Sequence, residues 1–406
     1  MKTADPVIAS TIDSDIIRSV HKTGSERLLS LDVLRGLTIG FMILVNDQVG
    51  PAPFSQLKHA AWNGFTATDL VFPTFLFLVG LSTVLSTQSR LTRGASSREL
   101  FLHVTRRTLL LILFGFVVNN FPFFRLATAR YYGVLPRIAI CYFAVAVLYL
   151  FAPRWKDKLV LAVACLIAYW LLMRFVPVPG YGIPTHDVPI NDQDGNLAAW
   201  LDRYIFSSPH LYERTRDPEG LLSTMPAIAT ALFGMLSGLW LRKQYAIRRK
   251  AAVLAVAGIM LLIAGLSWSP YFPINKKLWT SSYALYAGGW SLLCLAVSIA
   301  IIDIWRVGRR ASSSVRPESG SHPLLYRPLL VFGTNAILAY MISELGDSIV
   351  RTVHISGVSA KVAAYRHITH VIPDPAWASL VYSLLFVLVC WLLVLPFYRR
   401  RIFLRI

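Results

Sequence analysis

Residues 58–80 read KHAAWNGFTATDLVFPTFLFLVG, a stretch that joins titratable side chains to an apolar run long enough to cross a membrane. The imidazole of His59 precedes this run, and the carboxylate of Asp69 lies near its start. Because a carboxylate carried into hydrocarbon costs several kcal/mol, it is seldom kept there without a function. We therefore expect the chemistry of this protein at the mouth of this predicted span.

The composition of the 406-residue chain is typical of a polytopic membrane protein. Apolar residues make up 55% of the chain and charged residues 15%, whereas soluble domains are about 25% charged. The runs long enough to cross a ~30 Å hydrocarbon core are residues 31–47, 66–88, 106–124, 133–152, 159–176, 222–241, 251–269, 281–304, 328–346 and 376–396. The sequence thus predicts an all-α integral membrane protein with about ten transmembrane helices.

Both termini are predicted on the cytoplasmic side, because an even number of spans returns the chain to the side where it began. With this orientation the inner segments carry most of the Lys and Arg residues that lie between spans, as the positive-inside rule requires. We interpret the net charge of +19 as a topology signal, and we predict no nucleic-acid partner. The same orientation places His59 on the outer face.

The chain is predicted to form one transmembrane domain, residues 29–396, between two cytoplasmic tails, residues 1–28 and 397–406. A long outer loop at 177–221 and a polar cytoplasmic linker at 305–327 interrupt this domain. The first tail lacks the apolar core of a cleavable signal peptide. We therefore expect the first span to act as its own insertion signal.

His59 is the leading candidate for a catalytic residue. A neutral imidazole can accept a proton from an attacking nucleophile or carry an acyl group itself, and the alternative is a solvated interfacial histidine. Asp69 lies ten residues further on, where it can orient His59 or stabilise the imidazolium. The alternative for Asp69 is a helix-capping role, which the helix dipole favours.

The first predicted span carries polar residues at both ends. At the inner end, Asp32 and Arg35 are three residues apart, so they can pair on one helix face, or Arg35 can meet a phosphate group. At the outer end, Asn46 can donate a hydrogen bond to an oxyanion. We interpret Asp47 as a polar residue that marks the end of the span.

Three later residues lie where a substrate can meet them. Arg137, in the outer half of the fourth span, requires an anionic partner, and Asp69 and Glu344 are the carboxylates at similar depth. Glu344 shares the ninth span with Asn335 and can bind a cationic or hydroxyl-rich substrate. Trp279 can stack on a sugar ring or lie in the interfacial aromatic belt, and we prefer the belt.

None of the common motifs of soluble enzymes is present. The chain contains no Walker loop, no dinucleotide-binding glycine fingerprint, no HExxH and no GxSxG. No metal site is predicted.

The chain resembles the heparan-α-glucosaminide N-acetyltransferase family and its bacterial relatives, from the first predicted span to the ninth. The string His-x-x-Trp-Asn-Gly followed by Asp-Leu-Val-Phe-Pro is specific to that family, whereas Leu-Asp-x-Leu-Arg-Gly is shared with the wider class of membrane carbohydrate acyltransferases. The stretches that carry the resemblance are residues 27–46, 58–80, 131–143 (YYGVLPRIAICYF), 217–238 (DPEGLLSTMPAIATALFGMLSG), 273–289 (PINKKLWTSSYALYAGG) and 332–345 (FGTNAILAYMISEL).

The resemblance implies acetyl transfer from cytoplasmic acetyl-CoA to the amine of glucosamine or a terminal glucosaminide, in a bacterial cytoplasmic (inner) membrane and as a homodimer. It maps the essential histidine of the family onto His59 and a nearby asparagine onto Asn46. The site residues that we predict are His59, Asn46 and Asp69 for catalysis, Arg35, Asp32 and Arg137 for acetyl-CoA, and Asn63, Asn275, Trp279 and Glu344 for the sugar.

Several alternatives remain open at this stage. His59 can act as general base in direct transfer or carry the acetyl group in a two-step route. An amino-sugar permease would line a path with the same polar residues. An O-acetyltransferase of the wider class would use an acceptor that lacks an amine.

Overall fold

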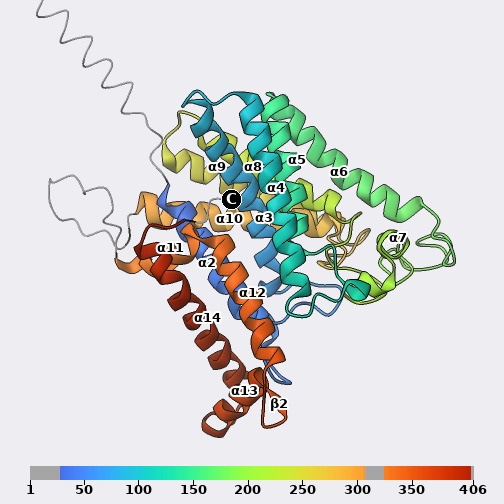
Figure 1. Cartoon of the computed structure of the whole chain (residues 1–406). Helices are drawn as coiled ribbons and strands as arrows, with labels where there is room; N and C mark the ends of the chain where they lie inside the picture. The colour runs from blue at the N-terminus through green and yellow to red at the C-terminus, as the bar shows by residue number, and fades with distance from the viewer. Residues whose placement is uncertain (1–27, 306, 308–323, 404–406) are drawn as a thin grey trace, which may run out of the picture.

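The computed structural model describes residues 28–305, 307 and 324–403, and this part of the chain is almost entirely helical (Figure 1). The elements in chain order are α2 (Leu29–Asn46), η1 (Ser55–Leu57), η2 (Ala67–Leu70), α3 (Val71–Leu91), α4 (Ser97–Asn120), η3 (Leu126–Thr128), α5 (Val134–Phe151), α6 (Trp155–Phe175), α7 (Leu197–Phe206), η4 (Ser208–His210), α8 (Thr224–Leu241), α9 (Ile247–Trp268), α10 (Ser281–Ile299), η5 (Ala300–Ile304), η6 (Leu324–Tyr326), α11 (Arg327–Thr334), α12 (Ala336–Thr352), β1 (His354–Ile355), β2 (Val358–Ser359), α13 (Ala360–Val371) and α14 (Pro375–Arg399).

Nine helices in the described part of the chain are long and apolar enough to cross a membrane, and a bent pair can supply a tenth span. The prediction of an all-α protein with about ten spans is confirmed. Helix α8 is 72% buried along its apolar window, whereas α4, α9 and α14 are each 22% buried. Helix α8 therefore lies at the centre of the bundle, whereas α4, α9 and α14 present an apolar face outward.

The predicted ninth span is not one straight helix, which corrects the sequence-based expectation. Helices α11 and α12 meet at an angle of 86°, with Asn335 between them at φ −126° and ψ 42°. Gly333 lies in the last turn of α11, where an added Cβ would be 2.0 Å from Asp32 O of α2. The two helices therefore pack against α2 separately, and Asn335 and Glu344 do not share one continuous helix.

Close helix packing at the centre depends on two glycines. A Cβ on Gly80 of α3 would lie 1.9 Å from Ala231 O, and one on Gly234 of α8 would lie 1.8 Å from Phe77 O. Small residues allow helix backbones to approach closely where the surrounding lipid provides no hydrophobic drive. The crossing of α3 and α8 thus fixes the helix that begins beside Asp69.

Both ends of the described chain lie at the same end of the bundle. The start of α2, η5, the start of α11 and the end of α14 share one apolar cluster there, which contains Leu29, Ile302, Leu330 and Tyr398. Which side of the membrane this end faces stays a prediction. The predicted tail at 1–28 and linker at 305–327 lie almost wholly outside the described residues, as do the last three residues of the tail at 397–406.

The opposite end of the bundle carries the long loops. The predicted outer loop at 177–221 contains the short helix α7, and α12 and α14 run side by side to α13 and the β1–β2 hairpin (Figure 1). Asp47 does not simply mark the end of a span, because it is 2% exposed and lies 3.3 Å from Lys361 Nζ. Lys361 also lies 2.5 Å from Asp347 Oδ1, so the cation joins α12 and α13 to the end of α2.

Candidate active site

A cavity of about 120 Å³ opens at the end of the bundle that carries the long loops. Of the α2 residues that line it, Ile39 is the farthest along the helix from Asn46, and its polar groups come mainly from the end of α2 and from the loops, so an apolar wall leads to a polar end. The residues that line it are Ile39, Met42, Val45, Asn46, His59, Thr68, Val71, Phe72, Phe75, Val134, Leu135, Ile138, Glu219, Lys276, Ile337 and Tyr340. A flexible ligand with an apolar arm and a reactive polar end matches this lining.

His59 and Asp69 form a hydrogen-bonded pair at the polar end of the cavity. His59 Nδ1 lies 2.8 Å from Asp69 Oδ1, and the Asp69 side chain has no exposed surface. Since an ionised carboxylate only accepts hydrogen bonds, the proton of the neutral imidazole belongs on Nδ1. The other nitrogen, Nε2, is then the basic atom of the ring, and Lys276 Nζ lies 3.1 Å from it.

Asp69 makes the contacts that both of the interpretations left open by the sequence require. Its Oδ2 accepts from Ala60 N and Thr66 N, each at 3.1 Å, and from Thr66 Oγ1 at 3.0 Å. Thr66 and Asp69 together form a capping box at the start of η2. The cap fixes one carboxylate oxygen, and the other orients His59.

Lys276 is the third charged member of this cluster, and the sequence analysis did not identify it. Its Nζ lies 2.8 Å from His59 Nδ1, 3.1 Å from His59 Nε2 and 3.8 Å from Asp69 Oδ1. Burial lowers the pKa of His59 below its ordinary value, and the Lys276 ammonium lowers it further, whereas Asp69 raises it. Burial lowers the pKa of Lys276 as well. The lowered pKa of His59 favours the uncharged imidazole, which can accept a proton, near pH 7.

Asn46 lines the same cavity, at the end of α2. Its Nδ2 lies 3.4 Å from Glu344 Oε1 of α12, a long contact that leaves the amide able to reorient. The structure thus brings His59, Asp69 and Asn46 to one place, and Glu344 contacts Asn46.

Arg137 has no carboxylate partner among the described ion pairs, contrary to the expectation that it would meet Asp69 or Glu344. It is fully buried and donates to Gly220 O at 2.9 Å and to Ser223 Oγ at 2.5 Å. Its Nε and Nη1 have no hydrogen-bond partner within the described residues. The guanidinium lies 5.2 Å from the centre of the Trp279 ring, so an aromatic face supplies part of its stabilisation.

Trp279 is not part of an interfacial belt, which corrects the preferred interpretation. Its side chain is 1% exposed, and Nε1 donates to Thr230 Oγ1 at 3.2 Å. The ring meets Phe72 and Tyr283 edge to face. A sequence window cannot show this burial, because the residues that cover Trp279 come from three other segments of the chain.

The two candidate sugar-binding asparagines contact each other. Asn275 is fully buried and donates from Nδ2 to Asn63 Oδ1 at 3.2 Å, while its own side-chain oxygen accepts from Leu278 N at 3.0 Å. Asn63 Oδ1 also accepts from Asn191 Nδ2 at 2.7 Å, and Asn63 is exposed. These amides join three loops beside the cavity.

Asp32 and Arg35 form the predicted ion pair, at 3.0 Å, near the opposite end of α2. Arg35 also donates to Gly333 O at 3.2 Å and to Ser82 Oγ at 2.7 Å, so it joins α2, α3 and α11. Eleven residues of helix separate Arg35 from Asn46, which corresponds to about 16 Å. Ile39, which lines the cavity, lies about one helical turn beyond Arg35.

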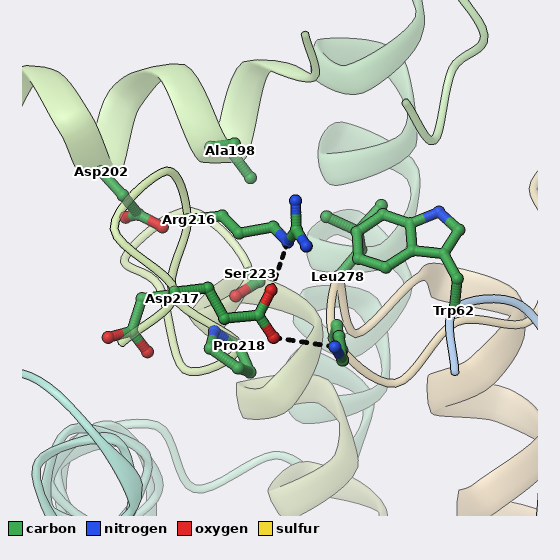
Figure 2. Close-up of a pocket in the computed structure, with 11 residues that line it drawn as sticks. Trp62, Ala198, Asp202, Arg216, Asp217, Pro218, Ser223 and Leu278 are labelled. Carbon is green, nitrogen blue, oxygen red and sulfur yellow. Dashed lines mark hydrogen bonds and ion pairs between the residues drawn. The ribbon is translucent and has the colours of Figure 1, made fainter. Parts of the chain in front are cut away.

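A second, smaller pocket lies on the long loops (Figure 2). Figure 2 shows the Trp62 ring beside Arg216, whose guanidinium lies 5.2 Å from the ring centre. Glu213 forms an ion pair with Arg216, whose Nε lies 2.6 Å from Oε2, and its Oε1 accepts from Lys277 Nζ at 2.7 Å. Because its charges pair with one another, this pocket offers a ligand little unpaired charge.

The sequence analysis also missed Glu219, the one carboxylate among the described residues that line the main cavity. It belongs to the turn 217–220, whose Gly220 has no room for a side chain because an added Cβ would lie 1.9 Å from Asp202 Oδ2. Burial raises the pKa of Asp202, on α7, to about 7. The sequence offered one signal for these two residues: Glu219 and Lys276 are charged residues within stretches 217–238 and 273–289, which carry the family resemblance.

The chain is similar to one protein-family model and to curated proteins. The family model described as heparan-alpha-glucosaminide N-acetyltransferase, catalytic, matches residues 27–269. Two curated proteins named heparan-alpha-glucosaminide N-acetyltransferase are similar to the chain, one from Mus musculus (30% identical over 353 residues) and one from Homo sapiens (31% over 358). Each alignment covers 74% of this chain but 53% and 52% of those proteins, so the chain spans about half of their length.

Proposed function

Because this chain belongs to the heparan-α-glucosaminide N-acetyltransferase family, we propose that it transfers an acetyl group from acetyl-CoA to the amine of glucosamine or a terminal glucosaminide. The observation that carries this proposal is the cavity with an apolar wall that ends at the His59–Asp69 pair. Such a pocket accommodates the pantetheine arm of acetyl-CoA and presents its thioester to a base.

In this proposal, acetyl-CoA enters the protein from the end of the bundle opposite His59. The phosphates of CoA do not cross hydrocarbon, so the nucleotide stays near basic groups at that end, where Arg35 lies about 16 Å along α2 from Asn46. Arg35 is already tied to neighbouring helices, so its contact with a phosphate requires those hydrogen bonds to rearrange. Contacts of Asp32 and Arg137 with CoA remain predictions.

His59 acts as general base at the other end. Its Nε2 takes a proton as the sugar amine attacks the thioester carbonyl, and it returns that proton to the leaving CoA sulfur. Asp69, hydrogen-bonded to Nδ1, keeps the required tautomer and stabilises the imidazolium. The Asn46 amide donates to the oxyanion that develops on the carbonyl.

We propose direct transfer, because an amine attacks an activated thioester without a covalent relay. The alternative route forms acetyl-His59 first. Rapid mixing of the purified protein with labelled acetyl-CoA, in the absence of sugar, separates the two routes. A stable acetyl-protein that is lost in His59→Ala would refute direct transfer.

A thiol-release assay tests the proposed function. Purified protein in proteoliposomes receives acetyl-CoA and one of several sugars, and we expect free CoA to appear only with acceptors that carry an amine. Release with sugars that lack an amine would indicate O-acetylation. Sugar uptake without CoA release would indicate a permease.

The finer expectations of location and assembly rest on family resemblance alone. A bacterial cytoplasmic membrane and a homodimer stay predictions, and so does the orientation that places His59 on the outer face. Labelling of single cysteines introduced beside His59, with a reagent that does not cross membranes, tests the orientation in intact cells.

A further inference from the structure

Glu219 is held at the cavity wall by contacts from two other segments. Arg130, in the loop before α5, donates from Nη2 to Glu219 Oε2 at 2.6 Å and to Asp217 Oδ1 at 2.5 Å. Asp202 of α7 accepts from Leu221 N at 2.9 Å, which fixes the other side of the same turn. The Glu219 carboxylate therefore has a defined position before any ligand arrives.

One oxygen of Glu219 is available to a ligand. Arg130 Nε and Nη2 already pair with both oxygens of Asp217, at 2.8 Å and 2.5 Å, so one guanidinium serves two carboxylates. No described residue donates a hydrogen bond to Glu219 Oε1, and the side chain keeps 13% of its surface exposed. A partly desolvated negative charge thus faces the cavity.

Apart from Arg130, the cations nearest to Glu219 make other contacts. Lys276, which also lines the cavity, lies against His59 and 3.8 Å from Asp69 Oδ1. Arg137 is buried behind Trp279 and donates to backbone and hydroxyl oxygens instead. A ligand cation at Glu219 Oε1 would complete the charge balance of this wall.

We propose that Glu219 is the residue that selects an amine acceptor: its carboxylate binds the ammonium group of an amino sugar at the polar end of the cavity. The identity of the acceptor as an amino sugar rests on the proposed function. An analogue with a hydroxyl in place of the ammonium can still donate a hydrogen bond to this carboxylate, but it forms no ion pair with it, so it binds more weakly.

The reaction then follows from the bound ammonium. The ammonium loses one proton to water, and the amine nitrogen attacks the thioester carbon. The new C–N bond forms as the C–S bond breaks, and His59 transfers the second amine proton to the CoA sulfur. Glu219 orients the nitrogen and does not take part in this last proton transfer.

Equilibrium binding of tritiated glucosamine to the purified protein, without acetyl-CoA and with glucose as the uncharged competitor, tests this inference. Glu219→Gln keeps an oxygen for Arg130 but removes the charge, and we expect it to weaken glucosamine binding about 10- to 100-fold. Glu213→Gln is the matched control. It removes a carboxylate that pairs with Arg216 and Lys277 outside the cavity, so the preference for glucosamine over glucose should persist.

The outcomes are distinct. Wild-type protein that does not prefer glucosamine, or Glu219→Gln that binds it as tightly as wild type, overturns the inference. Equal loss of glucosamine and glucose binding in Glu219→Gln also overturns it, because that pattern indicates damage to the fold and not the loss of a charge contact. In that case Glu219→Asp should also lose the binding of both sugars. Amine-selective binding that depends on Glu219 but is accompanied by no CoA release refutes the proposed function and leaves the inference intact.

Discussion

His59 Nδ1 lies 2.8 Å from Asp69 Oδ1, and this contact joins an irregular loop to the first turn of a buried helix. The carboxylate is fixed by the Thr66 capping box, so the orientation of the imidazole depends on how α3 begins. Helix α3 is in turn held against α8 by the close approach at Gly80 and Gly234. The geometry of the His59–Asp69 pair thus depends on packing at the centre of the bundle.

His59→Ala should lose glucosamine-dependent CoA release by about 100-fold or more, because general acid–base catalysis by a positioned side chain contributes 10²–10⁴-fold. The protein should still fold, insert and bind acetyl-CoA. His186 provides the control, since its Nδ1 lies 2.6 Å from Asp187 Oδ1 on an exposed part of the outer loop. Full activity in His59→Ala, or an equal loss in His186→Ala, would contradict the assigned role.

Lys276→Met should shift the pH dependence of the reaction. The Lys276 ammonium lowers the pKa of His59, so its removal raises that pKa. His59 acts in its neutral form, and activity is lost as the pH falls through its pKa. The acidic limb of the kcat/KM profile should therefore move to higher pH in Lys276→Met. Lys277→Met should leave the limb in place, because Lys277 pairs with Glu213; an identical shift in both variants would contradict the argument.

The sequence predicted the membrane fold and the central pair well. Long apolar runs identify spans because hydrocarbon requires every backbone group to bond within its own segment. The ten-residue spacing of His59 and Asp69 is local, so the hydrogen bond between them was within reach of the sequence.

Long-range contacts explain what the sequence could not predict. Lys276 reaches His59 from 217 positions away, and Arg130 reaches Glu219 from 89 positions away. The break at Asn335 depends on contacts of α11 with α2, which no local pattern displays. The charged residues of the predicted outer loops indicated only the topology. The fold is needed to show which of them line the cavity.

Gly80→Ala should destabilise the protein by about 3 kcal/mol, since overpacking costs about 1–3 kcal/mol and the added methyl group meets backbone that cannot rotate away. Its Cβ would lie 1.9 Å from Ala231 O. The midpoint of thermal unfolding in detergent measures the effect. Gly346→Ala, whose Cβ would lie 3.5 Å from the Phe386 ring, should be neutral or stabilising by up to ~1 kcal/mol. Equal midpoints for the two variants would show that the α3–α8 contact relaxes freely.

Lys361→Met should cost about 1–3 kcal/mol of stability, because it removes the cation that lies against Asp47 and Asp347, while Arg351 Nε still lies 2.5 Å from Asp347 Oδ2. Asp47→Asn should cost much less. Burial raises the pKa of Asp47 from 3.8 to about 8, so at neutral pH the folded protein already holds it largely protonated, and asparagine resembles that form. A raised carboxyl pKa means that folding takes up a proton, and the stability from that uptake is lost as the pH rises between about 4 and 8. Asp47→Asn should therefore flatten the fall of the unfolding midpoint over this range; a slope equal to that of the wild type would show that Asp47 is ionised in the folded protein.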